Sequence, residues 1–243
     1  MKELDDIFHE KRYELGPSYT RNVALSLQPQ SFSDFLQHPE FDEVFRLWTQ
    51  GWNWYGLDKA RVWALAINLK RVLSRTSGSL AEVGVYKGNS ASLLSHYARE
   101  YARRIYLCDT FDGFDPSQFE DDFSEGKIAA FKDAGLHIAQ SRVAPHDGVR
   151  WVKGMFPDSV TEEMRQDSFA FVHLDCDIYA PTLSGLDFFW PRLERGGLVF
   201  IHDYASGYWP GAAKAVDEFC DANGVEGFVL PDACGTFVLT KGA

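Results

Sequence analysis

The segment 80–92, LAEVGVYKGNSAS, constrains the fold of this chain more than any other part of it. Its apolar run predicts a buried strand, Gly84 and Gly88 predict a turn, and Asn89 and Ser90 are typical caps of a following helix. A strand, a glycine turn and a helix N-terminus expose backbone N–H groups at the edge of a sheet. The segment therefore predicts a ligand site, although a turn whose glycines are only steric fits the pattern equally well.

Two common phosphate-binding signatures are absent from this segment. The glycines are not spaced as G-x-G-x-x-G, and no Lys-Ser or Lys-Thr pair follows Gly88, as a P-loop requires. Glu82, an acid just before the turn, suits ribose or amino groups better than a pyrophosphate. The turn therefore indicates a ligand other than one held by its phosphates.

From Asp58 onward, predicted strands alternate with predicted helices. The predicted strands are 80–85, 105–108, 149–152, 169–174, 198–201, 227–230 and 236–240. Helices are predicted from 58 to a stop at 77–78, through 93–101, around 128–131, at 181–193 with a stop at 196–197, and at 210–220 with a stop at 224. This alternation is typical of α/β proteins, so we predict a mostly parallel seven-stranded sheet with helices on both faces.

Residues 1–57 do not follow this alternation. They combine many aromatic side chains with Pro17, Pro29 and Pro39, which indicates short helices and loops. We interpret the segment as an aromatic-rich helical cap over the sheet or as a contact in a homo-oligomer, with plain packing on the flank of the sheet as an equal alternative. The predicted division is a cap over 1–57 and a ligand-binding domain over 58–243.

The composition excludes several classes of partner. A net charge of −11 argues against a nucleic-acid-binding surface, which needs a basic face. No apolar run approaches the length of a membrane span, and no signal peptide is visible, so we expect a cytoplasmic protein without a membrane partner. The four cysteines, Cys108, Cys176, Cys220 and Cys234, are scattered without a C-x-x-C pair, which favours buried free thiols over disulfides or zinc ligands.

Side chains able to do chemistry follow four of the predicted strands. They are Glu82, Asp109, Asp175 with Asp177, and His202 with Asp203. A single acid at a strand end is often only a cap or a turn former. Parallel strands lie about 4.8 Å apart and bind ligands beyond their carboxyl ends, so these side chains are expected to meet at one edge. Asp109, one strand–helix–strand unit after the glycine turn, suits a ribose diol and so indicates a nucleoside ligand.

Several segments together resemble the macrocin O-methyltransferase family. They are LAEVGVYKGNSAS, IYLCDTFDGF, VKGMFPDSV, FVHLDCDIYAPT and GGLVFIHDY followed by WPGAAKAVDEF, and they cover roughly residues 50–240 in order. The family consists of S-adenosylmethionine-dependent enzymes that methylate sugar hydroxyls on bacterial natural products. The resemblance implies a class I methyltransferase fold, related to the Rossmann fold, and a small-molecule acceptor, namely a sugar or a glycosylated natural product.

The resemblance also implies a set of cofactor-binding residues. Residues expected to hold the methionine and ribose end of S-adenosylmethionine are Glu82, Gly84, Tyr86, Gly88 and Ser90. Asp109 would bind the ribose hydroxyls, and Thr110 and Phe111 would lie near the adenine. The first segment is also similar to the turn of catechol O-methyltransferases, so a phenolic acceptor is the alternative to a sugar.

By the same resemblance, Asp175, His202 and Asp203 would bind a divalent metal such as Mg²⁺ or Mn²⁺ that activates the acceptor hydroxyl. The family usually has Asp-Asp-Tyr where this chain has His202-Asp203-Tyr204. Magnesium prefers oxygen ligands, so three alternatives stay open. The site binds a metal that tolerates imidazole (Mn, Fe, Co, Ni or Zn), or His202 is a metal-free general base, or the site has lost its metal and its activity.

The sequence thus predicts an S-adenosylmethionine-dependent O-methyltransferase with Asp175 and His202 as its catalytic residues. A nicotinamide-dependent oxidoreductase is disfavoured because no G-x-G-x-x-G and no helical Tyr-x-x-x-Lys pair is present. A catalytically decayed cofactor-binding protein is the alternative from another class. His173 is expected to be a packed or hydrogen-bonded core residue, while Tyr208 and Trp209 either stack on a sugar ring or brace the next helix.

Overall fold

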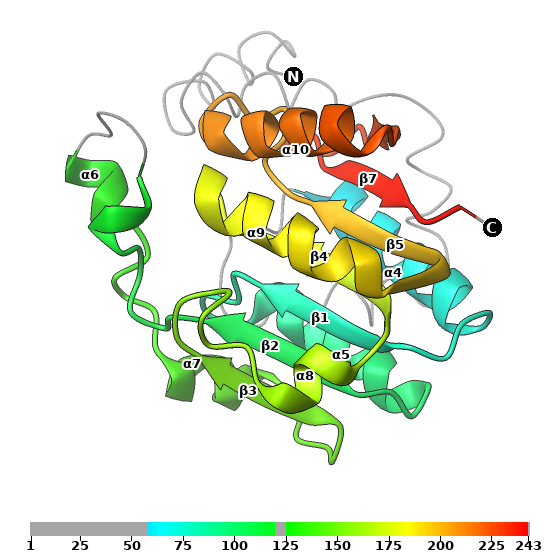
Figure 1. The fold of residues 1–243 in the computed structure, drawn as a ribbon. Coiled ribbons are helices and arrows are strands. Elements are labelled where there is room, and N and C mark those ends of the chain that lie inside the picture. Colours follow the sequence, from blue (N-terminus) through cyan, green and yellow to red (C-terminus); the bar gives the residue numbers. More distant parts are fainter. Residues whose placement is uncertain (1–57, 120–124, 243) are drawn as a thin grey trace, which may run out of the picture.

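A computed structural model describes residues 58–119 and 125–242 of the chain, so the predicted cap over 1–57 lies outside the described residues. The described residues form a seven-stranded sheet with the order β3-β2-β1-β4-β5-β7-β6. The first five strands in this order pair in parallel, whereas β7 runs antiparallel to both β5 and β6 (Figure 1). The predicted α/β fold with a mostly parallel seven-stranded sheet is confirmed.

The strands lie close to the predicted segments. Their bounds are β1 Ser79–Val83, β2 Ile105–Asp109, β3 Val149–Lys153, β4 Phe169–Leu174, β5 Leu193–Ile201, β6 Gly227–Val229 and β7 Phe237–Thr240. Each residue of β4 is buried, as expected for a central strand covered on both faces. The first strand ends at Val83 rather than at residue 85, because Gly84 has a φ of 90° and turns the chain out of the sheet.

Helices cover both faces of the sheet, as predicted. One face carries α4 Lys59–Leu73, α5 Asn89–Glu100 and α7 Leu136–Arg142, and the other carries α8 Glu162–Gln166, α9 Tyr179–Phe189 and α10 Pro210–Asn223. Successive β1 residues alternate between the two cores, since Leu80 packs in one and Ala81 in the other. The short helix α6 Glu125–Ile128 and the 3-10 turns η2 Pro116–Gln118 and η3 Trp190–Arg192 complete the described elements.

The predicted helix over 181–193 and its glycine stop need correction. Helix α9 ends at Phe189, where Pro191 lacks the N–H that would continue it and a 3-10 turn takes over. Gly196 and Gly197 lie inside β5 rather than after a helix, and the pairing of β4 with β5 changes register between Phe169 and Phe171. Gly196 has a φ of 80°, which a glycine adopts without strain at such an irregularity. In contrast, Gly224 ends α10 in the left-handed conformation, as predicted.

The fold brings the carboxyl ends of β1, β2, β4 and β5 to one edge of the sheet (Figure 1). Gly84 lets β1 and β4 approach closely there, since a Cβ at this position would overlap the carbonyl group of Asp175. Within 58–119 and 125–242, no helix is long and apolar enough to span a membrane. The predicted site therefore lies where neighbouring parallel strands end together.

Candidate active site

A cavity of about 420 Å³ opens at the carboxyl edge of the sheet, a volume typical of small-molecule sites. Predicted site residues on its wall are Gly84, Tyr86, Ser90, Asp109, Thr110, Asp175, His202 and Asp203. They come from the ends of β1, β2, β4 and β5 and from the start of α5. The structure thus brings together most of the side chains that the sequence predicted to meet.

Three other predicted residues lie behind this wall rather than on it. Glu82 is fully buried in β1, and its Oε1 lies 2.8 Å from Nδ1 of His173. Phe111 is buried against Trp151, with ring centroids 6.0 Å apart. Gly88 faces the backbone of α7, where an added Cβ would lie 3.2 Å from Cα of Ala139. The expectation that His173 is a hydrogen-bonded core residue is confirmed.

Asp109 organises the turn after β1. Its Oδ2 accepts hydrogen bonds from the backbone N–H groups of Val85 (2.7 Å) and Tyr86 (2.8 Å), while its Oδ1 accepts one from Phe111 N–H (2.6 Å). The turn was expected to offer its N–H groups to a ligand, but Asp109 engages these two. A carboxylate that accepts several backbone N–H bonds is held in one orientation, so Asp109 is a rigid part of the wall.

The start of α5 is built differently from the prediction. Gly88, with a φ of 86°, is the N-cap residue, no side chain caps the helix, and Asn89 is already its first residue. Asn89 Oδ1 accepts from Arg142 (2.8 Å), while its Nδ2 is buried without a hydrogen-bond partner among the described residues. Asn89 and Ser90 line the cavity. A helix N-terminus with an unpaired amide donor suits an anionic group such as a carboxylate.

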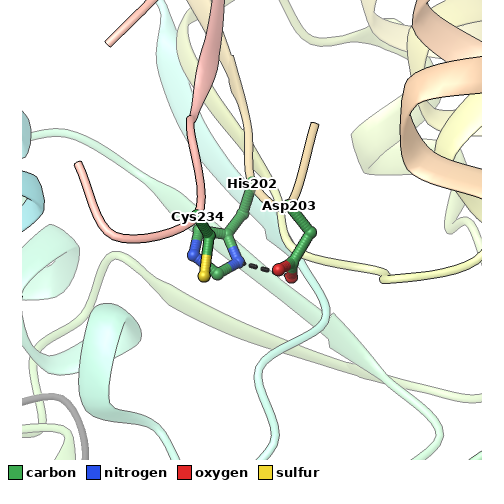
Figure 2. Close-up of side chains that lie close together, drawn as sticks. All are labelled: His202, Asp203 and Cys234. Carbon is green, nitrogen blue, oxygen red and sulfur yellow. Dashed lines mark hydrogen bonds and ion pairs between the residues drawn. The ribbon is translucent and has the colours of Figure 1, made fainter. Parts of the chain in front are cut away.

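His202 lies between two carboxylates. Its Nδ1 is 2.6 Å from Asp203 Oδ2 and 2.9 Å from Asp175 Oδ1. Its other ring nitrogen, Nε2, is buried and has no hydrogen-bond partner among the described residues. Figure 2 shows the Nδ1 side of the ring directed at Asp203, with Cys234 beside the ring. The arrangement orients the imidazole through Nδ1, while Nε2 is the buried ring nitrogen that no carboxylate engages.

Arg61 approaches the same group from α4. Its side chain is 2% exposed, and its Nη2 donates to Asp175 Oδ2 at 2.7 Å. The same nitrogen lies 3.2 Å from Nε2 of His173, which is bonded in turn to Glu82. Asp58 caps α4 by accepting from the backbone N–H of Arg61 at 3.1 Å. A chain of buried polar contacts therefore runs from the core of the sheet to the cavity.

Charges within this cluster shift the protonation of its members. Burial raises the pKa of Asp175, but His202 and Arg61 lower it more, so its pKa lies well below the usual value. Burial and Arg61 lower the pKa of His202, but Asp175 and Asp203 together raise it well above 6.5. Burial raises the pKa of Asp177 well above its usual value, with further increases from Asp203 and Asp175. The cluster thus favours the ionised form of Asp175 and raises the proton affinity of His202.

Aromatic rings form the opposite wall of the cavity. Phe114 lies 5.3 Å from Phe131 and 5.4 Å from Trp209 between ring centroids, and all three rings line the cavity. Trp209 is buried directly before α10, whereas Tyr208 beside it is half exposed. Trp209 therefore braces the start of α10 and also presents a face to the cavity.

The geometry can now be compared with known proteins. The family model described as macrocin-O-methyltransferase (TylF) matches residues 6–237. The chain belongs to this family. A relative from Streptomyces olivaceus, 8-demethyl-8-(2,3-dimethoxy-alpha-L-rhamnosyl)-tetracenomycin-C 4'-O-methyltransferase, is 29% identical over 140 residues. That match spans 53% of this chain and 53% of the relative, so it covers only about half of either protein.

Solved structures share the class I methyltransferase fold. The O-methyltransferase NovP superposes with a TM-score of 0.63 at 21% identity, covering 76% of this chain and 81% of NovP. The MycE methyltransferase of the mycinamycin pathway, in complex with Mg and SAH, superposes with a TM-score of 0.53 at 18% identity. That match covers 84% of this chain and 55% of MycE. At these identities the comparison establishes the fold.

Some residues of this macrocin O-methyltransferase family member were not predicted as site residues. The sequence could have identified Arg61 as a buried residue, because it lies four residues before Leu65 and therefore on the apolar face of α4. Asp177, which was expected at this edge of the sheet but was given no role, lines the cavity together with Cys234. A carboxylate oxygen of Asp177 lies within 4.8 Å of one from Asp175 and one from Asp203. The four cysteines are free, with Cys108 and Cys176 buried. Burial raises the pKa of Cys234 to about 11, so it is a neutral thiol.

Proposed function

We propose that this chain is an S-adenosylmethionine-dependent O-methyltransferase that acts on a sugar hydroxyl of a natural product. Membership of the macrocin O-methyltransferase family supports the reaction, and the relative named as a methyltransferase of a rhamnosyl tetracenomycin supports the acceptor class. The cavity at the carboxyl edge of the sheet has the position and the size that such a reaction needs.

The residues on the cavity wall fit the cofactor, which supplies a methyl group on its sulfonium sulfur when bound. Its methionine carboxylate would lie at the N-terminus of α5, because Asn89 Nδ2 is a buried donor without a partner among the described residues. Ser90 would lie beside it, while Gly84 and Tyr86 would line the ribose. Asp109 would accept from the ribose hydroxyls.

The remaining predicted cofactor residues would either line the cavity or pack behind its wall. Thr110 lines the cavity and would border the adenine. Gly88 and Phe111 support that wall from behind. Glu82 supports it through the buried contact with His173.

We assign the general base to His202. A neutral imidazole whose Nδ1–H donates to Asp203, with Asp175 2.9 Å away, keeps its lone pair on Nε2, as in a Ser-His-Asp triad. Nε2 would accept the proton of the acceptor hydroxyl while the oxygen attacks the methyl group in line. The resulting imidazolium would be stabilised by both carboxylates. The observation that carries this assignment is a cavity-lining imidazole whose Nδ1 is bonded to Asp203 beside Asp175, which makes Nε2 the ring atom able to accept a proton.

Calorimetric titration with S-adenosylhomocysteine, followed by methyl-transfer assays on rhamnosides and catechols, tests this function. We expect micromolar binding and transfer to a rhamnoside hydroxyl. His202→Ala should retain cofactor binding and lose most of the transfer rate, whereas the exposed His137→Ala, away from the cavity, should behave as wild type. Absence of binding would refute the cofactor assignment, and transfer only to catechols would refute the sugar acceptor. Wild-type transfer by His202→Ala would refute the base.

A further inference from the structure

The carboxylates of Asp175 and Asp203 already have cationic or N–H partners from within the chain. His202 Nδ1 lies 2.6 Å from Asp203 and 2.9 Å from Asp175, and Arg61 Nη2 lies 2.7 Å from the second oxygen of Asp175. The contacts of His202 with Asp203 and of Arg61 with Asp175 are charge-assisted hydrogen bonds, while His202 and Asp175 lie at an ion-pair distance. The ring nitrogen of His202 thus lies within 3 Å of both carboxylates.

This donor set does not fit a metal. Ionised carboxylates only accept hydrogen bonds, so Nδ1 must carry a proton in order to bond to them. A protonated ring nitrogen has no lone pair for a metal, and Nε2 is the ring atom that has no bond to either carboxylate. Mg²⁺ takes oxygen ligands in near-octahedral geometry and has no use for a protonated imidazole. Asp175, His202 and Asp203 therefore do not act together as metal ligands.

Burial makes the internal partners necessary. The side chains of Arg61, His202 and Asp203 are 2%, 7% and 7% exposed, and that of Asp175 is partly buried at 19%. Two carboxylates this close together and removed from water need positive charge or N–H donors to remain ionised. Arg61 supplies a permanent charge, because a guanidinium does not deprotonate in proteins. His202 supplies the donor shared by both carboxylates.

We propose that Arg61 and His202 replace the divalent metal ion at this site, so that the chain holds its catalytic carboxylates without a metal. This inference rests on the proposed function for its consequence, namely methyl transfer that needs no metal. Arg61 then supplies one positive charge to these carboxylates, and His202 supplies an N–H donor. The proposed replacement requires a histidine at position 202.

Manganese binding, followed by the electron paramagnetic resonance signal of free Mn²⁺, tests the proposal. Wild-type protein should leave the free signal unchanged, while His202→Asp, which adds an oxygen ligand and removes the N–H donor, should bind about one Mn²⁺ per chain. His202→Asn is the matched control, because it removes the ring without adding a carboxylate, and it should bind no more Mn²⁺ than wild type.

Several outcomes would overturn the proposal. Stoichiometric Mn²⁺ binding by wild type would overturn it. Loss of that binding in Asp177→Asn would then show that the ion is held by the carboxylates of Asp175, Asp177 and Asp203. Equal binding by His202→Asp and wild type would show that His202 is not what excludes the ion. Circular dichroism and S-adenosylhomocysteine titration of each variant identify misfolded protein.

If His202→Asp does not fold, wild type alone decides the question. Its methyl-transfer rate should stay within twofold after treatment with EDTA and after addition of Mg²⁺, and a tenfold loss on chelation would overturn the proposal. Failure of the proposed function looks different. In that case neither S-adenosylhomocysteine binding nor transfer occurs under any condition, while the Mn²⁺ result is still obtained.

Discussion

The ends of β1 and β2 and the ends of β4 and β5 build two halves of one cavity in different ways. The first half is made largely from backbone, with Asp109 holding two turn N–H groups and α5 presenting its N-terminus. The second half is made from buried charges, with His202 shared by Asp175 and Asp203 and with Arg61 arriving from α4. The first half suits a cofactor bound in one orientation, and the second suits proton transfer.

Removing His202 should give the largest difference between the two halves, because it should impair catalysis and leave cofactor binding intact. Without a base the acceptor hydroxyl keeps its proton, so His202→Ala should lower kcat by about 10²–10⁴-fold. The affinity for S-adenosylhomocysteine should change little, because its proposed contacts lie on the first half. Steady-state kinetics and calorimetry on the same preparation check this. A parallel fall in cofactor affinity would mean that the halves are not independent.

Gly84 lies where the two halves touch, so a side chain there should damage both. Its φ of 90° is unfavourable for alanine, and the added Cβ would overlap the backbone of Asp175. Gly84→Ala should therefore reduce the free energy of unfolding by about 3 kcal/mol. Gly242→Ala is the control, since no atom lies within 4 Å of its Cβ position. Urea unfolding of both variants measures the difference, and equal stabilities would contradict the close approach of β1 and β4.

The two halves also differed in how well the sequence predicted them. Val85 in the glycine turn and Asp109 lie 24 residues apart, one strand–helix–strand unit, so their place at one edge of the sheet could be predicted, whereas the hydrogen bonds between them could not. Arg61 and Asp175 are separated by 114 residues, and nothing local links an arginine in a helix to an acid after a strand. The protonation state of His202 depends on that distant contact, which is why three alternatives for the site stayed open at the level of sequence.

The fold itself followed from the alternation of strands and helices, and its errors have local causes. Helices α7 and α8 were missed because each is short, with 7 and 5 residues, and neither gives a clear helical period. Asn89 and Ser90 were expected to cap α5, but Gly88 in the left-handed conformation takes that position and frees both side chains for the cavity. Residues of these types can either cap a helix or line a cavity. Asn89 takes the second role, and its Oδ1 accepts a hydrogen bond from Arg142.

The pH dependence of kcat should be set by the ionisable side chains of the second half. Asp175 and Asp203 raise the pKa of His202 well above 6.5, so the protonated ring, which cannot act as a base, persists to higher pH than in a free imidazole. The value of kcat should therefore rise with pH and level off only above that pKa. Asp203→Asn removes one of the two carboxylates, which lowers the pKa and should move the rising limb down by about 1 pH unit. Rate profiles between about pH 6 and pH 9 measure both curves. Coincident midpoints would contradict the role of Asp203.

The smallest expected effect belongs to the first half and concerns Asn89. If its unpaired Nδ2 donates to the methionine carboxylate, Asn89→Ala should weaken S-adenosylhomocysteine binding by about tenfold, the loss of one hydrogen bond to a charged group. The value of kcat at saturating cofactor should stay near wild type, because the base lies on the other half. Asn89→Asp sharpens the test, since it replaces the amide donor by a carboxylate of similar shape and should weaken binding further through repulsion. Stronger binding by Asn89→Asp would mean that a cationic group of the ligand, rather than its carboxylate, lies at the start of α5.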